Sequence, residues 1–184
     1  QEVIDLVLDE LRSGDPERQA GAIAIVRDIP GEAITKALAD ELPKLSPAVQ
    51  VQLLSTLADR GDPTALPAVV EAAKAQDESV RIAALRAIGQ LGSAESVAML
   101  AQRAAESRGQ QQKAARDSLY RLRGSDINAT ILQALASAEP DVKVELIRAV
   151  GERNVVDGVS ALLESAANEN RKVCLLYTSD AADE

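Results

Sequence analysis

One helix-ending pattern recurs about every thirty residues along this chain of 184 residues. Each copy is an apolar helical segment followed by glycine or asparagine, as in the stretch VRIAALRAIGQLG. These residue types are favoured just after a helix because they adopt the left-handed backbone conformation at little cost. The marker residues lie 30, 31, 32 and 30 positions apart: Gly31, Gly61, Gly92, Gly124 and Asn154. A period of this length predicts a repeat architecture.

Apolar positions around the markers predict two amphipathic helices in each repeat, because their spacing keeps them on one helical face. The residues four before a marker are Leu57, Ile88, Tyr120 and Val150. Apolar residues return five, eight and nine positions after a marker, as at Leu66, Val69 and Val70. We also expect side-chain caps at the helix starts, from Asp15, Ser46, Asp62, Asp77, Ser93 and Ser125.

Composition agrees with many small, closely packed helices. The chain is 46% hydrophobic but only 1% aromatic, so its apolar content is mostly Ala, Leu, Val and Ile. A single pair of such helices is too small to bury its own apolar face, and neighbouring pairs must therefore stack on one another.

The segments DESVRIAALRAIGQLGSAESVAMLAQRAAES and GDPTALPAVVEAAKAQDESVR resemble HEAT repeats, particularly the short bacterial form also found in phycobilisome-lyase-type proteins. The resemblance covers about residues 1–170. It implies an all-α, right-handed α-solenoid of about five to six antiparallel helix pairs, whose second helices line a concave binding surface. We expect repeats at about 1–31, 32–61, 62–92, 93–124 and 125–154, with a truncated one at 155–173.

The last eleven residues, CLLYTSDAADE, differ from everything before them. Written as codons, they match an adapter used in transposase-based sequencing libraries. We therefore predict that residues 174–184 are a non-native tail and that the chain is a fragment of a larger protein.

Charge and residue content exclude several classes of function. The net charge of −9 opposes general binding to nucleic acid or anionic lipid, and no apolar stretch approaches a membrane span. There is no His, and Cys174 is the only cysteine. A histidine-based triad and a His/Cys metal cluster are therefore excluded, and no nucleotide-binding glycine motif occurs. We expect no catalytic residues, no metal and no cofactor.

Polar residues eleven before the markers predict a ladder along the second helices, made of Gln50, Arg81, Lys113 and Lys143. HEAT-type proteins commonly use an Asp and a basic residue to bridge successive repeats. With Asp77 before Arg81, and Asp141 before Lys143, the resemblance favours a structural role for this ladder.

The candidates for partner contact lie elsewhere on the second helices. Arg86 and Arg148 sit six before their markers without an obvious partner. The repeat ending at Gly124 is locally basic and holds Arg116 and Tyr120, which makes it a candidate site for an acidic partner or a phosphate. The alternative, which we favour for this repeat, is a solvated and slightly degenerate repeat in which Tyr120 fills the core position of Ile88.

The leading expectation is a scaffold that binds a partner protein on the surface formed by the second helices. One alternative, implied by the resemblance, is a chaperone-like lyase that attaches a linear tetrapyrrole. A second is a repeat appendage of an enzyme lying outside this chain. Nucleic-acid binding ranks last, because the chain is acidic and has only two Tyr and no other aromatic residue. The partner and the compartment are not encoded in any motif.

Overall fold

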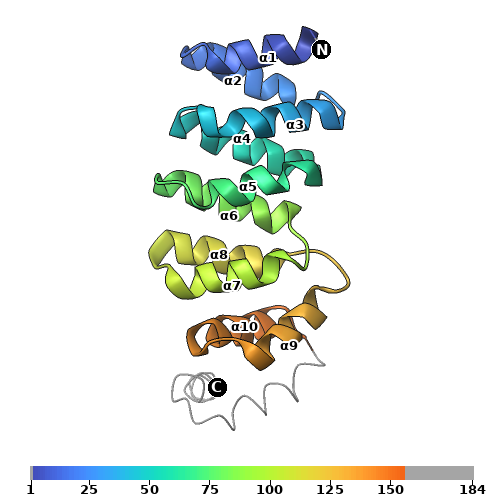
Figure 1. Cartoon of the computed structure of the whole chain (residues 1–184), viewed down its shortest axis with the longest axis vertical. Coiled ribbons are helices and arrows are strands. Elements are labelled where there is room, and N and C mark those ends of the chain that lie inside the picture. Colours follow the sequence, from blue (N-terminus) through green and yellow to red (C-terminus); the bar gives the residue numbers. More distant parts are fainter. Residues whose placement is uncertain (1, 156–184) are drawn as a thin grey trace. The chain divides into compact units, whose positions relative to one another are not determined.

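The computed structural model describes residues 2–155 of the chain. It forms two compact units that meet in sequence at Gly92 and Ser93. All regular structure in the described residues is helical (Figure 1). The predicted all-α fold class is therefore confirmed. The predicted repeat at 155–173 and the predicted tail at 174–184 lie, apart from Val155, outside the described residues.

The N-terminal unit contains three consecutive helix pairs. They are α1 (Glu2–Arg12) with α2 (Pro16–Val26), α3 (Glu32–Glu41) with α4 (Pro47–Arg60), and α5 (Leu66–Ala72) with α6 (Glu78–Leu91). Short 3-10 helices η1 (Leu42–Lys44) and η2 (Pro63–Ala65) lie between α3 and α4 and before α5. Within this unit the second helices pack in sequence, α2 on α4 and α4 on α6, while the first helices α1, α3 and α5 also contact one another in turn.

The described part of the C-terminal unit contains two more pairs. They are α7 (Ser96–Glu106) with α8 (Gly109–Arg121), and α9 (Ile127–Ser137) with α10 (Pro140–Glu152). Helix α10 packs on α9 within its own pair and also on α7 and α8 of the preceding pair. Stacking of consecutive pairs within each unit is the arrangement of an α-solenoid.

The core follows a strict period of 31 residues. One position on the first helices is buried in all five pairs: Val7, Leu38, Val69, Leu100 and Ile131. One position on the second helices is equally buried: Val26, Leu57, Ile88, Leu119 and Val150. The core residue of α8 is therefore Leu119, and the favoured placement of Tyr120 at the position of Ile88 was wrong. The cause is the segment from Leu119 to Gly124, which is one residue longer than those before Gly61, Gly92 and Asn154 and shifted the count from the marker.

Two helix starts have the predicted side-chain caps. A carboxylate oxygen of Asp15 accepts hydrogen bonds from the backbone N–H groups of Glu17 and Arg18, and Asp77 accepts one from Val80. Such caps satisfy donors that have no partner inside the helix. Asp62 caps the 3-10 helix η2 in the same way.

Three other predicted caps differ from the structure. Ser46 occupies the cap position of α4, but its side chain makes no capping hydrogen bond. The predictions for Ser93 and Ser125 were wrong, because α7 and α9 begin later and their cap positions belong to Glu95 and Asp126.

The markers end helices in different ways. Gly61 has the left-handed conformation at φ 67°, and Asn154 also has a positive φ of 50°. Gly92 instead has φ −71° and ψ 161°, an extended conformation open to any residue, so the left-handed prediction was wrong there. The second helix thus ends at or shortly before the marker in each repeat, but the backbone conformation of the marker residue differs between repeats.

Candidate binding surfaces

Two members of the predicted polar ladder, Gln50 and Arg81, join the two helices of one pair. Near the start of a second helix, a side-chain N–H donates to a backbone carbonyl in the last turn of the first helix or in the loop that follows it. The contacts are Gln19 to Leu11, Gln50 to Leu45, Arg81 to Ala75 and Gln76, and Gln112 to Ala104. These donors lie 31 residues apart. Each one satisfies a carbonyl that the end of a helix leaves without a partner.

This geometry corrects the prediction at Lys113. The ladder position in α8 belongs to Gln112, whereas Lys113 forms an ion pair of 3.2 Å with Asp117 on its own helix. Asp77 caps α6, as described above. Asp141 lies exposed in the first turn of α10, and Lys143 is half-buried at the next ladder position.

A second set of contacts, which bridges successive pairs, was missed by the sequence analysis. The guanidinium of Arg60 at the end of α4 donates to the carbonyl of Val26, the last residue of α2, and to that of Ile29 in the loop after it. It also donates to the Thr35 hydroxyl in α3. Arg60 therefore gives hydrogen bonds to carbonyls at the end of α2 and fixes the first turn of α3.

Arg153 makes the same contacts in the C-terminal unit. It donates to the carbonyls of Tyr120 at 2.7 Å and Leu122 at 2.9 Å, and to the side-chain oxygen of Asn128 at 2.8 Å. Burial lowers the pKa of Arg153. Both arginines stand directly before a marker residue, a regularity in the sequence that could have identified them.

Arg116, a predicted partner contact, is already engaged within the protein. Its Nε and Nη2 each donate to one carboxylate oxygen of Glu145, both at 2.6 Å, which joins α8 to α10. This hydrogen bonding, ahead of all other causes, raises the pKa of Arg116. The Glu145 side chain is 5% exposed, so the pair is a shielded link between two helix pairs.

Tyr120 lies half-buried beside this ion pair. Burial is the largest cause that raises the pKa of its phenol, followed by the charge of Glu145. The charges of Arg116 on α8 and of Arg148 and Glu152 on α10 also act on it, so the ring lies near the part of α10 that carries the latter two. The structure therefore brings three of the predicted contacts, Arg116, Tyr120 and Arg148, into one neighbourhood of the C-terminal unit.

Arg86 and Arg148 occupy the same register position, 62 residues apart. Both side chains are exposed, and neither has an ion-pair partner among residues 2–155. Arg86 lies on α6 in the N-terminal unit, and Arg148 on α10 in the C-terminal unit.

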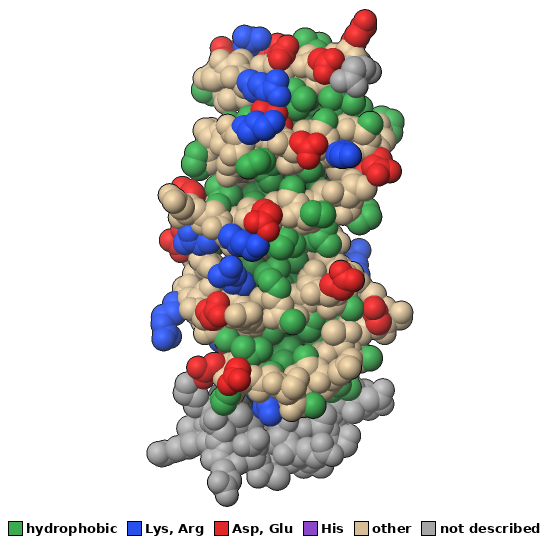
Figure 2. Space-filling model, viewed as in Figure 1, with side chains coloured by type: hydrophobic (Ala, Val, Ile, Leu, Met, Phe, Trp, Pro, Cys, Tyr) green, Lys and Arg blue, Asp and Glu red, His purple; other side chains and the backbone are tan. Residues whose placement is uncertain are grey.

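The local excess of basic residues in α7 and α8 is partly neutralised. Arg103 lies 3.9 Å from Glu106, and Lys113 and Arg116 have the carboxylate partners described above. On the face visible in Figure 2, cationic and anionic side chains of the described residues are interspersed with hydrophobic ones within each unit. This distribution does not favour nucleic-acid binding, which needs clustered cations.

Residues 2–155 contain no cluster of acidic, His or Cys side chains that could hold a metal ion. Over the same residues, no helix is both long and apolar enough to cross a bilayer.

Comparison with known proteins gives one family. The family model for HEAT repeats matches residues 32–120. A search of curated proteins finds no significant match. Among solved structures, the crystal structure of an engineered protein is similar, at 20% identity and a TM-score of 0.49, over 94% of this chain and 92% of the other. The helix pairs and their 31-residue register agree with the family match, and residues 32–120 of the chain are HEAT repeats.

Proposed function

We propose that this chain is a non-catalytic scaffold that binds a partner protein on the exposed surface of its second helices. HEAT repeats commonly serve as protein-interaction scaffolds, and stacked repeats present extended surfaces suited to that role. The proposal places the strongest contact in the C-terminal unit, on α8 and α10.

One observation carries this placement: Tyr120 is half-exposed near Arg148, which has no ion-pair partner among residues 2–155. At the register position of Tyr120 the second, third and fifth pairs carry the small residues Ala58, Gly89 and Gly151, and the first pair carries Arg27, so α8 alone among the described pairs presents an aromatic ring there. Tyrosine and arginine are the residue types that most often dominate binding energy at protein interfaces.

The ion pair near Tyr120 supports a preformed contact surface. Arg116 is fixed by two hydrogen bonds to Glu145, and the charges of both residues act on the Tyr120 phenol. A side chain that is ordered before binding loses less conformational entropy when the partner arrives.

The charges define the chemistry of the partner. Both carboxylate oxygens of Glu145 are used by Arg116, while the guanidinium of Arg148 is exposed. Near Tyr120, Arg148 and the exposed Glu152 thus carry one charge of each sign, and Arg148 fits an acidic side chain of the partner next to an apolar one. Arg86 in the N-terminal unit offers a second contact of the same kind.

The test is alanine substitution against a partner captured by affinity purification. Titration calorimetry should show that Tyr120→Ala and Arg148→Ala each weaken the dissociation constant at least about tenfold. Lys36→Ala is the matched control, because Lys36 is an exposed cation on the first helix α3. Unchanged affinity in Tyr120→Ala and Arg148→Ala would refute the proposed surface.

A further inference from the structure

The first helices of the N-terminal unit are bridged in one place by an ion pair. Arg12 at the end of α1 donates from Nε and Nη2 to the two carboxylate oxygens of Glu41 in α3, at 2.7 and 2.5 Å. One repeat later, 31 residues on, the corresponding positions hold Pro43 and Ala72. The bridge between α1 and α3 thus has no counterpart between α3 and α5, because both charged side chains are replaced by short apolar ones.

A groove of about 550 Å³ lies where this bridge is missing. Pro43 and Ala72 both line it, and the rest of its apolar lining comes from Ala39, Leu42, Ala68 and Ala75. Alanine leaves the space that an arginine and a glutamate fill one repeat earlier. A volume of this size is in the range of ligand-binding clefts.

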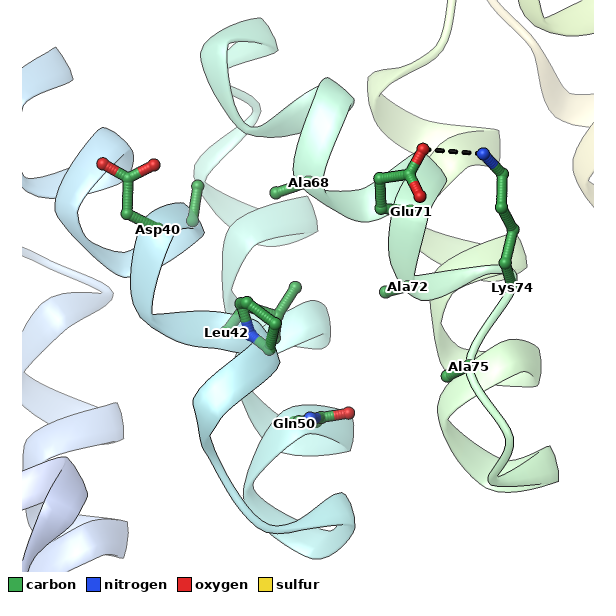
Figure 3. A pocket seen from close by; sticks show the side chains of 10 residues that line it. Asp40, Leu42, Gln50, Ala68, Glu71, Ala72, Lys74 and Ala75 are labelled. Atoms are coloured by element: carbon green, nitrogen blue, oxygen red, sulfur yellow. Dashed lines mark hydrogen bonds and ion pairs between the residues drawn. The ribbon is translucent and has the colours of Figure 1, made fainter.

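The rim of the groove is charged. In Figure 3, Asp40 on α3 and Glu71 on α5 stand at its two sides with Ala68 between them. Glu71 is bound by Lys74 at 2.6 Å, an exposed pair that competes weakly with a ligand. The Asp40 carboxylate is exposed and has no ion-pair partner among the described residues.

The surrounding charge favours a cationic occupant. Residues 1–92 contain fifteen acidic and nine basic side chains, so the field around this unit attracts positive groups. An arginine or lysine has an apolar stem that can lie on an alanine-lined floor while its head remains among carboxylates and water. Such a side chain would occupy the space left by the missing bridge.

We propose that the groove between α3 and α5 binds a short protein segment in which an arginine or lysine lies between apolar residues. The stem and its neighbours pack on Ala68, Ala72 and Leu42, and the cationic head pairs with Asp40. This site uses the first helices of the N-terminal unit together with Gln50 near the start of α4. It therefore stands independently of the surface proposed above around Tyr120 and Arg148.

The test is fluorescence anisotropy of two labelled, end-blocked pentapeptides with the whole chain. One has the sequence Ala-Leu-Arg-Leu-Ala, and the other has Glu in place of Arg. We expect the arginine peptide to bind at least about tenfold more tightly, and its binding to weaken as salt rises. Equal binding of both peptides, or no binding of either, would overturn the proposal.

Variants locate the site. Pro43→Arg with Ala72→Glu rebuilds the bridge seen between Arg12 and Glu41, and should abolish peptide binding by filling the groove. Ala68→Leu fills the floor by a different route, should the double variant fail to fold as judged by circular dichroism. If the folded Ala68→Leu protein binds like the wild type, the peptide does not use the groove and the proposal fails.

Charge controls complete the experiment. Asp40→Asn should weaken binding about two- to fivefold, the range of a solvent-exposed ion pair. Asp28→Asn makes the same change at an exposed residue outside the groove and should leave binding unchanged. Equal effects of these two substitutions would count against the site. Loss of peptide binding in Arg148→Ala would place the peptide on the second helices instead and refute the groove.

Discussion

Glu41 provides the most quantitative prediction about stability. Its carboxylate is 3% exposed and accepts hydrogen bonds from Arg12 and from Lys44. The hydrogen bonds from Arg12, ahead of the opposing effect of burial, lower the pKa of Glu41 from 4.5 to about 2. Taken at face value, this change corresponds to roughly 3 kcal/mol of folding free energy. Because the Arg12 side chain is 48% exposed, solvent screens the pair, and we expect about 1–2 kcal/mol.

The substitution Glu41→Gln keeps the shape of the side chain and removes the charge. The lowered pKa stabilises the folded state fully above pH 4.5, and this contribution disappears as pH falls towards 2. Urea unfolding followed by circular dichroism should therefore show Glu41→Gln less stable than the wild type by about 1–2 kcal/mol at pH 7. The difference should close between pH 4.5 and 2. A difference independent of pH would show that packing, and not ionisation, accounts for the effect.

Three further predictions concern stability, measured by urea unfolding. Gly61→Ala should destabilise the folded state by about 1 kcal/mol, because φ is +67° there. Gly21→Ala lies inside α2 with open space at its Cβ and should stabilise the folded state by about 0.5–1 kcal/mol. A change of the same sign in both variants would contradict the argument from backbone conformation. Leu119→Ala should lower the free energy of unfolding by about 2–5 kcal/mol and Tyr120→Ala by clearly less, since Leu119 is the core residue. The reverse order would show that Tyr120 fills the core position instead. Arg60→Met should lower the free energy of unfolding by about 2 kcal/mol, because it leaves backbone carbonyls without a donor. Arg60→Lys should recover only part of this loss, because lysine lacks the planar guanidinium with its several N–H donors. Full recovery in Arg60→Lys would mean that charge alone matters.

The local structure was largely predictable from sequence. Helix formation and the caps at Asp15 and Asp77 depend on interactions over a few residues, and such interactions leave a pattern in the sequence. The recurrence of that pattern about every thirty residues revealed the repeats. The candidate site was only partly predictable. Arg148 was identified as an exposed cation, but the engagement of Arg116 by Glu145 was not, because the partner lies 29 residues away on another pair.

The sequence by itself determined that short helices alternate with helix-ending residues, because helical periodicity and capping act locally. Only the tertiary structure decided which residue of α8 enters the core, since Leu119 and Tyr120 are adjacent hydrophobic residues and the extra residue before Gly124 shifts any count made from the marker. It also decided that Arg12 and Glu41 close one gap between first helices while Pro43 and Ala72 leave the next one open. Contacts between stacked pairs depend on positions a whole repeat apart, and packing alone brings those positions together.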